Sequence, residues 1–213
     1  MKLDLHTHTH RSGDSTTTMD EYVHGLDASG IDVVAVTDHL TIEGALLLAD
    51  LLGPRVIVGQ ELRVREGELI GLFLSERIPP GLRAIEAAVL IRDQGGLVYV
   101  PHPGDTGRSS IKDNDLWELA SAGVIDIIEV ANSKVAPNGL IPIASQVCAR
   151  LGIAVGAGSD AHIETAIGST YLEVPPGKVT SSAELLAALA HGKVHAQYFD
   201  PPRGWRARIV PAS

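Results

Sequence analysis

Imidazole and carboxylate side chains recur at paired positions in this chain. His6 and His8 are two residues apart at the end of an apolar segment, and Asp160 and His162 repeat that spacing. In an extended segment, residues two apart project from the same face, so each pair can present both side chains to one metal ion. Mixed imidazole and carboxylate ligands suit manganese, zinc, iron or magnesium, and a chain with a single cysteine disfavours an iron-sulfur or zinc-thiolate site.

Further candidate ligands share a position at or just beyond other apolar runs: Asp38, His39, Glu61 and His102. In parallel α/β folds, residues beyond the carboxyl ends of the strands share one rim, where active sites are built. Five of the nine histidines take part in this pattern, and chance would rarely place so many at strand ends. We interpret His24, His191 and His195 as surface or hydrogen-bonded histidines without a metal role.

The elements that must position these side chains alternate along the chain. Seven short apolar segments predict strands: Lys2 to Leu5, Asp32 to Val36, Arg55 to Gly59, Leu69 to Leu74, Leu97 to Val100, Ile125 to Val130 and Ile153 to Val155. Six stretches have helical spacing: Met19 to Ala28, Ile42 to Leu52, Leu82 to Gln94, Asn114 to Ala122, Leu140 to Leu151 and Ala183 to Ala190. This alternation predicts a mostly parallel α/β fold.

The composition is that of a globular protein. With 213 residues and 45% apolar content, the chain can bury one core, so we expect a single domain over 1–200 followed by a C-terminal extension over 201–213. No run of about eighteen apolar residues is present, and the opening residues are too polar for a signal peptide, so we expect a soluble, cytoplasmic protein without a membrane partner. Cys148 lies in an apolar run and is expected on a buried helix face.

The formal charge of -9 disfavours broad attraction to nucleic acid, which usually needs a basic surface. A short oligonucleotide held by bound metal ions remains compatible with this charge. The sequence does not indicate an oligomeric state.

Five ordered motifs resemble those of the polymerase and histidinol phosphatase (PHP) family, over about Lys2 to at least Val174. They are Asp-Leu-His-Thr-His at 4 to 8 with Ser12 and Asp14 behind it, Thr-Asp-His at 37 to 39, Gly-Gln-Glu at 59 to 61, Pro-His-Pro at 101 to 103, and Gly-Ser-Asp-Ala-His at 158 to 162. The resemblance implies a distorted TIM-like barrel of about seven strands and helices, with two or three divalent metal ions at one mouth.

The resemblance also implies how the ligands are shared. The first metal ion would be held by His6, His8, Glu61 and Asp160. Glu61 would bridge to a second ion, which His102 also binds. The third ion would be held by Asp14, His39 and His162.

One position departs from the family pattern. The family commonly has a histidine in the strand after the bridging glutamate, and this chain has Glu68 there. If the segments on either side form a hairpin, Glu68 lies near Glu61 and is a substitute ligand, which would favour harder metal ions. The alternative is an exposed acid in the turn over 65–68.

The expected activity is hydrolysis of a phosphoester. As a hypothesis, a metal-bound hydroxide at a di- or trinuclear site attacks phosphorus, with Glu61, His102 and Asp160 as the catalytic group. Arg108 and Lys134, in loops near the rim, are expected to bind the substrate phosphate. A small phosphomonoester or nucleotide is the expected substrate. The alternatives are a nuclease acting on oligonucleotide ends and a non-catalytic, metal-stabilised binding module.

Overall fold

Nine strands form one curved sheet in the computed structural model, which describes residues 1–200. The strands are β1 (Lys2–Thr7), β2 (Val33–Val36), β3 (Val56–Val64), β4 (Gly67–Leu72), β5 (Leu97–Val100), β6 (Ile127–Asn132), β7 (Ala154–Gly158), β8 (Tyr171–Glu173) and β9 (Lys193–His195). Their order in the sheet is β7-β6-β5-β4-β3-β2-β1-β8-β9. Neighbours are parallel from β1 to β3 and from β5 to β7, while β4 is antiparallel to both of its neighbours.

The sheet nearly closes into a barrel, because the end of β1 meets the segment that follows β7. Thr7 and Ala161 form a parallel bridge, and the Asp160 N–H donates to the His6 carbonyl at 2.7 Å. The His8 N–H donates in turn to the Ala161 carbonyl at 2.9 Å. These backbone hydrogen bonds join the segment of His6 and His8 to the segment of Asp160. The predicted distorted barrel is confirmed.

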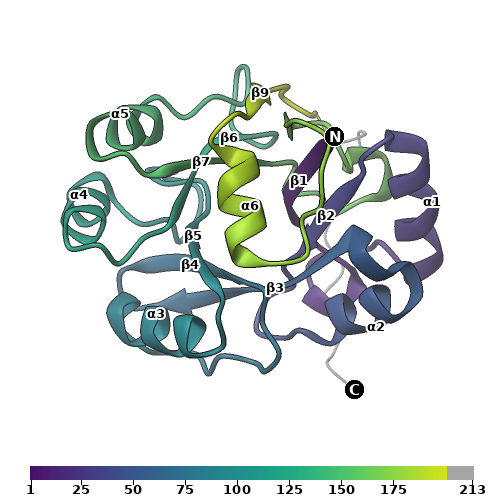
Figure 1. Cartoon of the computed structure of the whole chain (residues 1–213), viewed down its shortest axis with the longest axis horizontal. Helices are drawn as coiled ribbons and strands as arrows, with labels where there is room; N and C mark the ends of the chain where they lie inside the picture. Colours follow the sequence, from purple (N-terminus) through teal and green to yellow (C-terminus); the bar gives the residue numbers. More distant parts are fainter. Residues whose placement is uncertain (201–213) are drawn as a thin grey trace.

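Five of the six α-helices surround the barrel (Figure 1). They are α1 (Met19–Ser29), α2 (Glu43–Leu52), α3 (Ala84–Asp93), α4 (Asp113–Ser121) and α5 (Pro142–Leu151). Short 3-10 helices lie at η1 (His10–Ser12), η2 (Gly53–Arg55) and η3 (Glu164–Ala166). Thr18 begins α1 with a capping box, in which its side chain accepts from the Glu21 N–H while the Glu21 carboxylate accepts from the Thr18 N–H.

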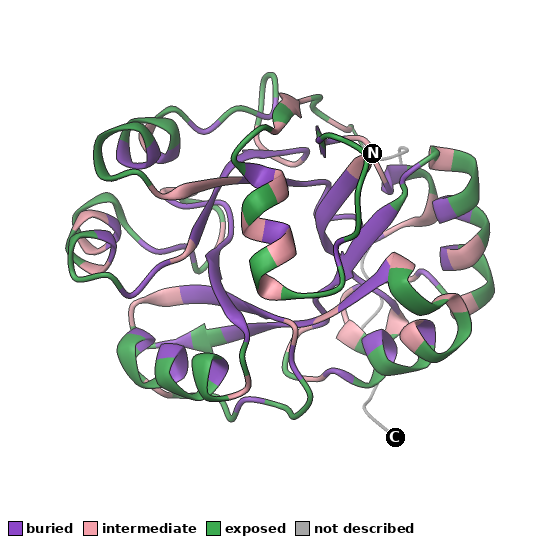
Figure 2. Cartoon of the chain, in the orientation of Figure 1, coloured by how far each residue is buried: buried purple, intermediate pink, exposed green. Residues whose placement is uncertain are grey.

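The remaining helix, α6 (Ser182–Leu189), lies across one end of the barrel, in front of the strands in Figure 1. Leu185 and Leu189 of this helix belong to the same buried cluster as the inward side chains of the barrel, such as Leu5, Ile57 and Tyr99. Strands β1 to β7 are mostly buried, whereas the outer faces of the helices are exposed (Figure 2). Because α6 covers one end, the polar groups gather at the other.

All seven predicted strands and all six predicted helices are present, with ends that differ by a few residues. The count of seven strands was too low, because β8 and β9 have three residues each and are too short for an alternating pattern to stand out. β1 and β3 also extend further than predicted, so that His6 and Glu61 lie within strands instead of beyond them. The two antiparallel pairings of β4 make the sheet less parallel than the alternation suggested.

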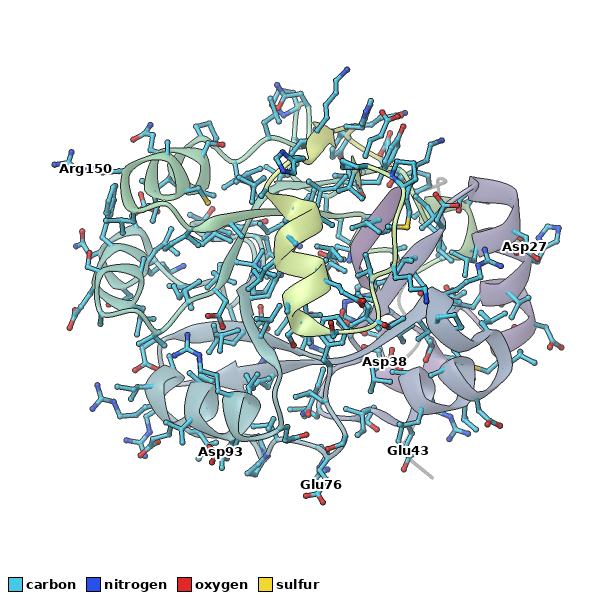
Figure 3. The ribbon with its side chains drawn as sticks, viewed as in Figure 1. Asp27, Asp38, Glu43, Glu76, Asp93 and Arg150 are labelled. Atoms are coloured by element: carbon cyan, nitrogen blue, oxygen red, sulfur yellow. The ribbon has the colours of Figure 1, made fainter. Side chains whose placement is uncertain are left out.

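Many acidic groups that contribute to the net charge lie on the outer helices and loops. Asp27, Glu43, Glu76 and Asp93 are exposed at the periphery of the molecule (Figure 3). Among the described residues, none of the helices has both the length and the apolarity needed to cross a membrane. The predicted C-terminal extension, 201–213, lies outside the described residues.

Candidate metal centre

Three buried candidate ligands converge at the open end of the barrel: His6 of β1, His8 just beyond it and Glu61 of β3. The Nε2 atoms of His6 and His8 lie 3.1 Å apart, and Glu61 Oε2 lies 3.2 Å from the first and 3.3 Å from the second. Asp160 Oδ1 is 3.7 Å from His6 Nε2 and 3.4 Å from His8 Nε2. Donor atoms of His6, His8 and Glu61 lie within 4.8 Å of one another, and Asp160 forms a second such group with His6 and His102.

The second group shares Glu61 with the first. Its other oxygen, Oε1, lies 3.2 Å from His102 Nε2, and Glu68 Oε2 lies 4.0 Å from the same nitrogen. Glu68 pairs with Arg63 across the β3–β4 hairpin and is only 4% exposed. The predicted hairpin is therefore present. The alternative of an exposed acid in a turn is wrong, because Glu68 lies within β4 and is buried.

The third group lies on the outer side of the first. Asp14 Oδ2 is 3.0 Å from His162 Nε2 and 3.3 Å from His39 Nε2, and the His8 ring stacks on His39 with centroids 4.9 Å apart. Asp14 Oδ1 is shielded from solvent, yet it has no hydrogen-bond partner among the described residues. A buried carboxylate oxygen without a partner is costly unless a cation occupies that position, so this donor set fits a metal ion.

The local backbone explains how two of these ligands reach the centre. His102 and Asp160 follow β5 and β7 with φ values of 28° and 51°, which turn the chain sharply at the ends of the strands. Gly158 allows β7 to approach β1, because a Cβ at this position would lie 2.4 Å from His6 Cβ and 2.7 Å from His6 N. The close contact of these two strands places the ligands of the first and last motifs together.

Opposite charges hold the centre in its ionised form. Burial favours the neutral form of Glu61, but His6 and His39 outweigh it and keep the pKa of that carboxyl well below its usual range. Burial likewise opposes protonation of His39, yet Glu61 and Asp14 raise its pKa to about 9. Burial, with His8 and Lys134 nearby, lowers the pKa of His162 to about 4, so this imidazole is neutral at pH 7.

The two predicted phosphate-binding cations both lie against Asp160. The Arg108 guanidinium donates to Asp160 Oδ2 and also lies 2.8 Å from Asp105 Oδ2. Lys134 Nζ lies 3.1 Å from Asp160 Oδ1 and 2.8 Å from His162 Nδ1. Both predicted cations are therefore at the rim of the centre, next to a candidate ligand.

One sequence candidate is not brought into the centre. Asp38 is fully buried, but its carboxylate accepts from the Thr9 N–H at 2.6 Å and from the Thr9 hydroxyl at 2.7 Å. It fastens the loop after β1 to the loop after β2, beside Gly44 of α2. Its neighbour His39 turns toward the metal ligands instead.

Several side chains support the centre by hydrogen bonds, and of the two serines among them only Ser12 stands behind a sequence motif. Ser110 Oγ lies 2.9 Å from His102 Nδ1, and Ser12 Oγ lies 3.1 Å from His8 Nδ1, so each ring is fixed by a hydroxyl. Tyr99 donates to Glu129 at 2.8 Å, inside the barrel below the ligands. Only their position after a motif histidine could have indicated the two serines, and nothing in the sequence pairs Tyr99 with Glu129.

The comparison with protein families agrees with this geometry. A family model described as PHP domain matches residues 4–128, which is more than half of the chain. This chain belongs to the PHP domain family. A second model, described as PHP-associated, matches residues 142–194 and so covers α5, β7 and α6. The resemblance noted in the sequence is confirmed over both segments.

Two uncharacterized proteins of Methanocaldococcus jannaschii are similar to this PHP domain. One is 42% identical over 116 residues, which cover 48% of this chain and 68% of the relative. The other is 38% identical over 122 residues, which cover 55% of this chain and 50% of the relative. The alignment thus spans only half the length of the second relative.

Solved structures share the fold at lower identity. A two-domain protein from Bacteroides vulgatus, described as containing a predicted PHP-like metal-dependent phosphoesterase, has a TM-score of 0.71 and 21% identity, over 93% of this chain and 64% of that protein. The lesion-specific endonuclease PfuEndoQ from Pyrococcus furiosus has a TM-score of 0.66 and 19% identity, over 95% of this chain and 60% of that protein. Both support the barrel fold of this PHP domain.

Proposed function

We propose that this PHP domain hydrolyses phosphoesters with the help of two or three divalent metal ions. The observation that carries the proposal is the convergence of imidazole and carboxylate ligands, whose donor atoms form overlapping groups within 4.8 Å of one another. The proposed ligands are those of the three groups described above: His6, His8, Asp14, His39, Glu61, Glu68, His102, Asp160 and His162. Divalent cations there would lower the pKa of bound water and offset negative charge on phosphoryl oxygens.

Arg108 and Lys134 are proposed to bind the substrate phosphate. Their charged groups stand at the mouth of the centre and contact opposite oxygens of the Asp160 carboxylate. Arg108 is further oriented by Asp105, which fixes the plane of its guanidinium. A phosphate that enters beside Asp160 would therefore meet two cations on one side, where they orient it toward the ligand cluster.

A neighbouring cavity supports a small phosphomonoester or nucleotide as the substrate. It has a volume of about 470 Å³ and is lined by Lys134, by Asp105 and by apolar side chains such as Val135 and Ile143. This volume lies within the range of small-molecule sites, and the partly apolar wall suits the organic part of an ester. Lys134 also lines the small hollow beside Asp160 and His162, so this side chain is shared by the cavity and the centre.

The proposal is tested by turnover. Purified protein is assayed with manganese, zinc or magnesium against an aryl phosphate, nucleoside monophosphates, histidinol phosphate and short oligonucleotides. His8→Ala and Asp160→Ala should abolish turnover, whereas His24→Ala, which alters an exposed histidine paired with Glu164, should leave it unchanged. Lack of turnover with every metal, or full activity of the two ligand variants, would reject the proposal.

The same assay separates the alternatives. An oligonucleotide substrate that makes several phosphate contacts should lose affinity steeply as salt rises, whereas a small monoester should not. Metal binding without turnover of any substrate would instead favour a non-catalytic binding module.

A further inference from the structure

Glu129 accepts hydrogen bonds from four groups directly below the metal centre. This β6 residue is fully buried. Its Oε1 accepts from the Tyr99 hydroxyl at 2.8 Å and lies 3.1 Å from His6 Nδ1. Its Oε2 accepts from the His102 backbone N–H at 2.6 Å and from Asn132 Nδ2 at 2.9 Å. Both carboxylate oxygens of Glu129 therefore accept hydrogen bonds from protein groups. Glu129 supports the metal centre from below and is not one of its proposed ligands.

The contact with Glu129 determines which nitrogen of His6 carries the proton. A carboxylate only accepts hydrogen bonds, so His6 Nδ1 must be the donor. In a ring that binds a metal ion, the lone pair would then be on Nε2, which lies 3.1 Å from His8 Nε2 and 3.2 Å from Glu61 Oε2. Hydrogen bonds of this kind fix the tautomer and orientation of metal-binding histidines.

The contact with His102 fixes a second ligand through its backbone. His102 has a φ of 28°, a conformation that residues other than glycine rarely adopt. Its N–H donates to Glu129, and its ring is held separately by Ser110, so that Nε2 reaches Glu61 Oε1 at 3.2 Å. One carboxylate thus anchors the ring of a ligand from β1 and the backbone of a ligand that follows β5.

We infer that Glu129 is a positioning residue that sets the tautomer of His6 and thereby the metal affinity of the centre. The inference rests on the metal site of the proposed function and assigns a role to a residue outside its ligand set. Its hydrogen-bond partners make the role testable. The Tyr99 hydroxyl and the His6 ring can either donate or accept a hydrogen bond, whereas the His102 backbone N–H can only donate.

Glu129→Gln should reverse the tautomer of His6. The glutamine amide nitrogen must replace one of the two oxygens, and it cannot face the His102 backbone N–H, because that group can only donate. The amide nitrogen therefore takes the place of Oε1, where the Tyr99 hydroxyl can turn to accept and His6 Nδ1 can accept if its proton moves to Nε2. All four partners then remain bonded, but the His6 lone pair no longer faces the centre.

The experiment combines a spectroscopic and a binding measurement on the purified chain. Long-range proton–nitrogen correlation spectra of zinc-loaded protein should show His6 protonated on Nδ1 in the parent, and this form should be lost in Glu129→Gln. Zinc affinity should fall by about ten- to a hundredfold. Tyr99→Phe, which removes another donor from the same oxygen, should leave the tautomer unchanged and the zinc affinity within a few fold of the parent.

Two results would overturn the inference: an unchanged His6 tautomer in Glu129→Gln, or a zinc affinity equal to that of Tyr99→Phe. If Glu129→Gln does not fold, the parent alone decides, because absence of the Nδ1 proton on His6 contradicts the assignment. A parent that binds no divalent metal would instead reject the proposed function, so the two failures are distinguishable.

Discussion

Gly158→Ala should damage both the stability of the barrel and its metal centre. A Cβ at this position would lie 2.4 Å from His6 Cβ and 2.7 Å from His6 N. Ordinary contact begins near 3.4 Å, so β1 and β7 must separate by roughly 1 Å to admit the methyl group. Because backbone atoms are involved, rotation of a side chain cannot relieve this overlap.

The expected cost follows from that displacement. Overpacking of this kind typically destabilises a protein by about 1–3 kcal/mol. His6 and Asp160 stand on opposite sides of the contact, and a displacement of about 1 Å in a catalytic site can reduce activity by roughly a hundredfold. We therefore expect a lower free energy of unfolding in urea and at least a tenfold weaker affinity for zinc.

Gly177→Ala is the matched control, because a Cβ at position 177 has no neighbour within 4 Å. It should be neutral or stabilising by up to about 1 kcal/mol, since alanine restricts the unfolded chain. Equal unfolding free energies for the two alanine variants, together with equal zinc affinities, would refute the account of how β1 and β7 bring the ligands together.

Three further predictions concern single side chains. Glu68→Ala should lower the number of bound metal ions per chain, as counted by elemental analysis after dialysis, and an unchanged count would show that Glu68 is not a ligand. Arg108→Ala should raise KM for a phosphomonoester by roughly 10- to 150-fold, because a charge-assisted hydrogen bond contributes about 1.5–3 kcal/mol. Unaltered steady-state kinetics would show that Arg108 does not bind the substrate. Burial raises the pKa of the Cys148 thiol to about 11, so only on the order of one thiol in a thousand is ionised at pH 8. Labelling by Ellman's reagent should therefore be slow until urea unfolds the protein. Rapid labelling of the folded protein would contradict the burial of Cys148.

The positions of the candidate ligands were predictable because they follow local patterns. Apolar, β-branched runs identify the strands, and polar residues at their ends must share the rim of a parallel barrel. His8, His39 and His102 could therefore be grouped before any contact was known. Asp38 satisfied the same pattern and yet turns away to Thr9, because a position after a strand does not specify which face a side chain takes.

The contacts between distant residues could not be predicted in the same way. Arg108 and Asp160 are 52 residues apart, and Tyr99 and Glu129 are 30 apart. Whether such side chains meet depends on the packing of several strands, which local spacing does not encode. Glu68 is an intermediate case, since the hairpin could be anticipated but the burial of its carboxylate could not.

Anomalous scattering from zinc-soaked crystals would show directly whether these side chains bind metal ions together. We expect two or three zinc peaks at the open end of the barrel, with Glu61 shared between two of them and His6, Asp14 or His102 among their neighbours. Peaks confined to other parts of the surface, or no peak within reach of Glu61, would contradict this expectation.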